Sequence, residues 1–294
     1  MLTVLFAVLA ALSNASAVVL QRAAARSVPQ DHAFSLRLVG DLLRNPVWFA
    51  GIAAVICAAV FQGLALSQGS LALVQPIFVS ELPFALVLGC LAFRRRLPAY
   101  GWAAVVMVAA GLALGLAGAA PAGGHARVGT VRWLPALAAS LAAMALCVGA
   151  ALPRPRGKAR AALFGAAAAI GYALTAALMK DAIGAFARHG AGAFFTSWQT
   201  YGFGAAGAAS LFLLSNAMES GPLVASQPAL TLGDALVSLT LGLLVYEERV
   251  RTGPWVLMEA AGVVLITAGV LILPRVEPGP PRRADGTGPP PVTS

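Results

Sequence analysis

The chain has 294 residues, of which 59% are hydrophobic and only 11% are charged. Soluble domains carry about 25% charged residues, so this composition excludes an ordinary soluble protein. The net charge of +9 does not indicate a nucleic-acid partner, because the basic residues gather at the ends of apolar segments. The three cysteines and three histidines have neither disulfide nor metal spacing, and no cofactor is expected.

Long apolar segments follow one another along the whole chain. A segment of about 18 or more apolar residues with few charges is typical of a membrane-spanning helix, because backbone in lipid must satisfy its own hydrogen bonds. The sequence therefore predicts an all-α polytopic membrane protein with nine transmembrane helices. The predicted helices cover residues 2–25, 46–67, 71–93, 99–119, 131–151, 159–179, 192–214, 222–245 and 254–273.

Three other stretches are predicted not to span. Residues 31–45 carry apolar side chains on one helical face, which is typical of an amphipathic helix on the membrane surface. An ordinary structured loop fits that stretch equally well. Residues 120–130 contain glycine and proline and mark the end of the first half. Residues 274–294 are rich in proline and glycine and are predicted to form a disordered cytoplasmic tail.

The distribution of basic residues predicts the orientation in the membrane. Cytoplasmic loops collect lysine and arginine. With the N-terminus outside, most of the 20 basic residues fall in cytoplasmic segments, among them Arg94–Arg96 and the loop after residue 151. We therefore expect a multi-pass protein of the plasma membrane, with its N-terminus outside and its C-terminus in the cytoplasm.

An internal repeat relates the two halves. A Gln-Pro pair opens the apolar run at residues 75–76 and again at 227–228, and Trp102 matches Trp255 in the helix that follows each run. The first four predicted helices thus match the last four, and the fifth links them. A single linking helix inverts the second unit in the membrane, and inverted repeats are a transporter architecture with a binding site near the bilayer midplane.

The repeat defines the domain organisation. The predicted parts are a first four-helix repeat (1–119), a loop with the linking helix and a basic cytoplasmic loop (120–158), a second four-helix repeat (159–273) and the tail (274–294). A formal Gly-x-Gly-x-x-Gly at residues 202–207 lies inside a predicted helix. It is therefore interpreted as a helix-packing surface rather than a dinucleotide site, which needs a preceding strand.

These features resemble a known superfamily. The four-helix unit resembles the small multidrug resistance proteins, and the duplicated whole resembles the drug/metabolite transporter superfamily, EamA-like proteins included. Residues 243–249, LLVYEER, are similar to the Gly-Glu-Arg-Leu signature that ends a helix in that superfamily, whereas residues 93–97, FRRRL, depart from it. The nine-helix layout is similar to the NIPA-like magnesium transporters. The resemblance covers about residues 1–273 and implies secondary transport. The sequence shows no catalytic triad, His-rich motif or phosphate loop, so we expect no enzymatic activity.

One departure limits what the resemblance implies. The small multidrug resistance proteins couple transport to protons through a glutamate of their first helix. Asn14 occupies that position here, and Tyr172 occupies it in the second repeat. Neither side chain exchanges a proton near neutral pH. Any proton coupling in this chain must therefore use Glu81 or Asp234.

Glu81 and Asp234 are the main candidates for a binding site, because each lies within a predicted helix. A charged side chain at the bilayer centre costs about 2.5–3.5 kcal/mol, so such residues usually serve a function. Around Asp234, a polar stripe at helical spacing faces either a cavity or a hydrogen-bonded seam between helices. The candidate substrate- or ion-binding residues are Asp234, Glu81, Gln227, Thr231, Ser238, Gln75, Asn14 and Tyr172.

Glu81 is supported differently, since its own helical face is apolar. Pro83 is expected to kink the helix and to free a backbone carbonyl that could join Glu81 in holding a cation. The alternative is a buried glutamate that is hydrogen-bonded to another helix.

Three functions remain open from the sequence. The leading one is transport of a small solute or ion by alternating access. A narrower one is Mg²⁺ transport, with Glu81 and Asp234 as ligands. The third is a membrane scaffold or sensor that transports nothing. The lipid bilayer and a small-molecule or ion substrate are the expected partners, and the sequence leaves the oligomeric state open.

Overall fold

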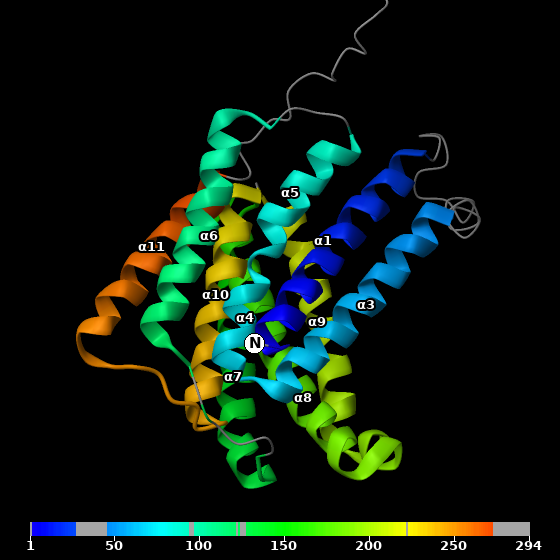
Figure 1. Ribbon diagram of the computed structural model, residues 1–294, viewed down its shortest axis with the longest axis vertical. Helices are drawn as coiled ribbons and strands as arrows, with labels where there is room; N and C mark the ends of the chain where they lie inside the picture. The colour runs from blue at the N-terminus through cyan, green and yellow to red at the C-terminus, as the bar shows by residue number, and fades with distance from the viewer. Residues whose placement is uncertain are drawn as a thin grey trace, which may run out of the picture.

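A computed structural model describes residues 2–27, 46–93, 97–121, 123, 128–221 and 223–272, which are helical and contain no strand. The predicted surface helix at residues 31–45 and the predicted tail at 274–294 lie outside the described residues. The helices are α1 (Leu2–Ser27), α3 (Pro46–Gln68), α4 (Leu71–Phe78), α5 (Glu81–Ala92), α6 (Ala99–Ala119), α7 (Thr130–Ala151), α8 (Lys158–Thr196), α9 (Trp198–Ser220), α10 (Leu223–Leu244), the 3-10 helix η2 (Gly253–Trp255) and α11 (Val256–Ile272) (Figure 1).

The described residues contain seven segments that are long and apolar enough to cross a membrane. They are Leu2–Gln21, Pro46–Gln68, Leu71–Ala92, Ala99–Ala119, Val131–Ala151, Lys158–Thr196 and Gly253–Ile272. In α10 the qualifying apolar stretch is the shorter Ala229–Leu244, and α9 is interrupted by polar residues. The prediction of an all-α polytopic membrane protein is therefore confirmed, while the figure of nine spans stays a prediction.

Helix α8 lies at the centre of the bundle. Its apolar stretch is 61% buried, against 17% for the stretches of α7 and α11. It packs against α9, α10 and α7, and it also contacts α3. On one flank α6 lies beside α11, and on the opposite flank α1 lies beside α3 (Figure 1). Contacts of α4 with α1 and α10 join the two flanks through the core.

The predicted helix at residues 71–93 is broken in two. Helix α4 ends at Phe78 and α5 begins at Glu81, so the break precedes Pro83 rather than coinciding with it. The reason is that a proline ring clashes with the carbonyl four residues earlier, which here belongs to Val79. That carbonyl accepts a hydrogen bond from the Leu82 N–H at 3.2 Å, so it is not the free ligand that the sequence suggested.

Helix α8 runs well beyond its predicted end. The sequence predicted a helix over residues 159–179 and another from 192, but α8 continues past Lys180 to a kink at Gly190. A short helical part after the kink ends at Thr196, and α9 begins at Trp198. Lys180 and Asp181 ended the predicted apolar segment, yet both are buried with hydrogen-bond partners, so the helix continues through them. Gly190 interrupts α8 with φ 77° and ψ −171°, a conformation that glycine adopts readily.

Small residues bring the helices into close contact, as the sequence predicted. A Cβ added at Gly111 of α6 would lie 2.7 Å from the carbonyl oxygen of Gly262 of α11, and one added at Gly262 would lie 2.7 Å from the carbonyl oxygen of Gly111. Within residues 202–207, Gly202 faces Leu178 and Gly207 faces Thr175, both of α8. These glycines therefore pack α9 against α8.

Candidate functional site

Glu81 lies at the start of α5, immediately after the break. The Asn14 Nδ2 of α1 donates a hydrogen bond to its Oε2 at 2.5 Å, consistent with the packing of α1 against α5. A carboxylate at the first residue of a helix is also favoured by the helix dipole. The break thus places Glu81 toward α1 and its Asn14 amide. From the sequence alone, the helical face of Glu81 offered only apolar neighbours.

The residue before Glu81 adds a polar group that the sequence analysis did not select. The Ser80 hydroxyl is buried and has no hydrogen-bond partner among the described residues. Buried polar groups normally have a partner, so an open hydroxyl beside a carboxylate is a position that a bound solute can use. The break between α4 and α5 is the feature that could have indicated Ser80, since polar groups at a helix break are not used by the regular helix.

Asp234 lies in α10 on the predicted polar stripe. The Ser238 hydroxyl one turn later donates a hydrogen bond to Asp234 Oδ1 at 3.4 Å, which confirms the shared helical face. Thr231 and Ser238 are both buried, so this face points into the bundle. The side chain of Gln227 lies outside the described residues.

Glu81, Asp234 and Tyr172 share one neighbourhood. The two carboxylates interact electrostatically with each other, and both act on the Tyr172 hydroxyl of α8. Residues from α1, α5, α8 and α10 thus converge, although they are far apart in sequence. Gln75 is buried in α4 at 2% exposure, before the break, and no interaction ties it to this group within the described residues.

Asn14, Glu81, Tyr172 and Asp234, together called the central group, form an arrangement that can bind a cation. It offers two carboxylates together with amide and hydroxyl oxygens. The described residues contain no cluster of three or more His, Cys, Asp or Glu side chains that could hold a metal. A metal ion between Glu81 and Asp234 would therefore take its other ligands from neutral protein oxygens or water.

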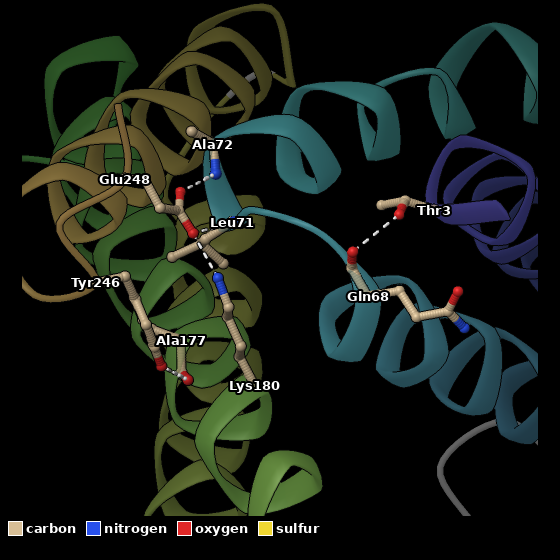
Figure 2. Close-up of polar contacts among 8 residues, drawn as sticks. All are labelled: Thr3, Gln68, Leu71, Ala72, Ala177, Lys180, Tyr246 and Glu248. Carbon is tan, nitrogen blue, oxygen red and sulfur yellow. Dashed lines mark hydrogen bonds and ion pairs between the residues drawn. The ribbon is translucent and has the colours of Figure 1, made fainter. Parts of the chain in front are cut away.

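A second polar group, the Lys180–Glu248 cluster, is buried beside the start of α4. Figure 2 shows its contacts. The Lys180 Nζ of α8 donates to Glu248 Oε1 at 2.5 Å. The same carboxylate accepts the backbone N–H groups of Leu71, at 2.6 Å, and Ala72, at 2.9 Å, at the start of α4. Glu248 therefore holds the segment after α10 against the start of α4.

Tyr246 completes this cluster. The Lys180 ammonium lies 4.3 Å from the centre of the Tyr246 ring, and the Tyr246 hydroxyl donates to the Ala177 carbonyl at 2.5 Å. Burial, with Asp181 and Glu248 nearby, raises the pKa of the Tyr246 hydroxyl well above its usual range. The hydroxyl consequently stays protonated and serves as a permanent donor.

Asp181 extends the cluster to α7 and α9. Its Oδ2 accepts a hydrogen bond from the Trp133 indole N–H at 2.7 Å, and the Gln199 amide lies at 3.5 Å. Trp133 packs edge-on against both Tyr246 and Trp198. Helices α7, α8 and α9 and the segment after α10 are thereby joined through polar groups on α8.

Neither Lys180 nor Glu248 is among the residues that the sequence selects for a site. Lys180 follows the predicted sixth helix directly, and Glu248 belongs to the helix-end signature at residues 243–249. The sequence nevertheless contains a signal for the pairing of Lys180 with Glu248. The predicted orientation places the end of the sixth helix, the end of the eighth and the start of the third on the same side of the membrane. Opposite charges at those ends can pair.

Comparison with known proteins identifies no family. No family model matches the sequence, and no solved structure is significantly similar to it. The chain is similar to an uncharacterized protein of Corynebacterium glutamicum, with 28% identity over 279 residues, which cover 92% of this chain and 94% of that protein. The similarity thus extends over both halves of the helical bundle.

Proposed function

We propose that the protein is a secondary transporter of a small cationic solute or ion that works by alternating access, as the resemblance to the drug/metabolite transporter superfamily implies. The proposed location is the plasma membrane, with the N-terminus outside. The central group of Asn14, Glu81, Tyr172 and Asp234 is the proposed binding site. A cation or a proton bound there would neutralise carboxylates that are costly within a membrane.

The observation that carries the proposal is the electrostatic interaction between Glu81 and Asp234. These residues belong to different halves of the chain, and both also interact electrostatically with Tyr172 of the central helix α8. A hydrogen-bonded packing contact between helices needs only one ionisable side chain, whereas a cation-binding site uses both carboxylates. The Ser80 hydroxyl beside Glu81, which has no hydrogen-bond partner in the part of the chain that the structure describes, supports the same interpretation.

The packing of the helices supports the proposed inverted repeat. The contact of α1 with α3 has a counterpart in that of α8 with α9. The contacts of α1 with α4 and α5 correspond to that of α8 with α10, and α6 pairs with its own counterpart, α11. In this proposal α9 and α10 also span the membrane, which completes two four-helix units joined by α7.

Uptake into proteoliposomes tests the function. The purified protein is assayed with labelled organic cations, with Mg²⁺ and with a pH-sensitive dye inside the vesicles. Asp234→Asn and Glu81→Gln are each expected to lower uptake by about tenfold or more, since an interaction with a charged group contributes roughly 1.5–3 kcal/mol.

Glu219→Gln is the matched control, because this exposed carboxylate lies at the end of α9, away from the central group. It is expected to transport like the unaltered protein. Unaltered uptake in both Asp234→Asn and Glu81→Gln would remove the central group from the mechanism. Absence of uptake for every solute and ion would favour the scaffold or sensor. Uptake of Mg²⁺ alone would favour the NIPA-like alternative.

A further inference from the structure

A cavity of about 480 Å³ lies beside the Lys180–Glu248 cluster, at the end of the bundle where α3 ends and α4 begins. Its polar lining residues come from the start of α1, the turn between α3 and α4, and the second half of α8. They are Thr3, Ser67, Gln68, Ser70, Lys180 and Arg188. The volume lies within the range of small-molecule sites, about 300–1,000 Å³.

The cavity is electropositive. Among the described residues that line it, Lys180 and Arg188 are basic and none is acidic. Glu248 neutralises Lys180 from behind, because its own side chain is fully buried and does not line the cavity. An ammonium has three N–H donors. Lys180 gives one of them to Glu248, and since it also lines the cavity, a ligand there can accept another.

Ser70 supplies an unused donor in the same cavity. It is 5% exposed, and its hydroxyl has no hydrogen-bond partner among the described residues. Ser70 is the N-cap of α4, where a serine usually accepts hydrogen bonds from the first backbone N–H groups. Glu248 takes the N–H groups of Leu71 and Ala72 instead, so Ser70 lines the cavity with a hydroxyl that makes no cap hydrogen bond.

We infer that this cavity binds a small oxyanion, the carboxylate or phosphate group of a free solute or of a lipid headgroup. Lys180 and Ser70 donate to the oxyanion from the inner wall, and the exposed Arg188 adds a second positive charge. Glu248 competes with the oxyanion for Lys180. The inference is independent of the proposed transport of a cation, because it uses none of the residues of the central group.

Binding to the full-length protein tests the inference. Inorganic phosphate and succinate are titrated onto the detergent-solubilised protein at constant ionic strength, with chloride as the reference anion. A second arm compares nanodiscs of phosphatidylcholine with and without phosphatidylglycerol. Arg188→Gln and Ser70→Ala are each expected to weaken binding, Arg188→Gln by about tenfold or more because it removes a charge-assisted contact.

Two controls remove the same groups elsewhere. Arg251→Gln deletes a positive charge that lies over the Trp255 ring, and Ser215→Ala deletes a hydroxyl that is bonded within α9. Both are expected to bind like the unaltered protein. Glu248→Gln is expected to tighten binding, because it removes the anion that competes for Lys180. A purely structural role of the ion pair predicts no such gain.

Each outcome of the binding experiments either supports or overturns the proposed oxyanion site. Binding of phosphate or succinate that depends on Arg188 and Ser70 supports a site for free solutes. Binding that depends on these residues only with phosphatidylglycerol supports the same site with a lipid headgroup as its ligand. If the unaltered protein binds no probe better than chloride, or if Arg188→Gln and Arg251→Gln weaken binding equally, the cavity is not an oxyanion site.

Discussion

At the scale of single residues, the Lys180–Glu248 pair is a deeply buried ion pair. Both side chains are almost fully buried, with 6% and 0% of their surface exposed. Transfer of two charges out of water is costly, and hydrogen bonds from the Leu71 N–H to Oε1 and from the Ala72 N–H to Oε2 of Glu248 add to the attraction that compensates it. Removal of one partner leaves the other charge without compensation.

This asymmetry gives a stability prediction. Lys180→Met alone is expected to lower the free energy of unfolding by about 3–5 kcal/mol, because Glu248 is then a lone buried charge. The double variant Lys180→Met, Glu248→Gln leaves no charge and keeps an oxygen for the α4 N–H groups, so most of the stability should return. Unfolding in mixed micelles measures both. A double variant as unstable as the single one would show that the pair contributes through packing instead.

At the scale of elements, the contact between α6 and α11 depends on the absence of side chains. The Gly111 and Gly262 backbones lie so close that a Cβ on either would overlap a carbonyl oxygen. Without a hydrophobic driving force between helices in lipid, such close packing is a main source of helix association. Beyond these glycines, Val108 and Leu112 of α6 pack with Val270 of α11 in a small buried cluster.

Gly111→Ala is therefore expected to destabilise the protein by about 1–3 kcal/mol, the usual range for overpacking. Gly204→Ala in α9 is the control, because nothing lies within 4 Å of a Cβ added there. Thermal unfolding of the two purified variants against the unaltered protein measures the difference. Equal unfolding temperatures for both variants would show that α6 and α11 separate without a cost.

The elements also show how far sequence reasoning extends. Apolar length and composition predicted the helices, because lipid requires each helix to satisfy its own backbone. Pro83 indicated an interruption of the helix. The interruption itself lies near Val79, because the proline ring clashes with the carbonyl four residues earlier. The continuation of α8 through Lys180 was not predictable from the local pattern, since the partner Glu248 lies 68 residues away. The contact of Asn14 with Glu81 likewise spans 67 residues.

At the scale of the whole molecule, the proposed orientation determines which end of the bundle faces outside. The basic loop around Arg156 lies at one end, and the segment around Arg251 lies at the other, beside the end of α6. The cavity next to Lys180 lies at the same end as Arg251 in this topology. The proposed oxyanion site would therefore open to the exterior.

Cysteine labelling in whole cells measures the orientation. In a background with Cys57, Cys90 and Cys147 replaced by alanine, Arg251→Cys is expected to react with a membrane-impermeant maleimide in intact cells. Arg156→Cys should react only after permeabilisation. Both positions are exposed, so access depends on the side of the membrane rather than on burial. The reverse pattern would invert the topology, and the cavity would then face the cytoplasm.

The position of Glu248 late in the chain has a consequence for biosynthesis. A ribosome adds about 5–20 residues per second, so Lys180 is made roughly 3–14 s before its partner, which follows 68 residues later. During that interval the nascent chain carries an ammonium in its central helix without Glu248, the carboxylate that pairs with it in the folded protein. Insertion of α8 must therefore await α10 or leave Lys180 at the water interface. A chain truncated before Glu248 should be recognised and degraded by membrane quality control.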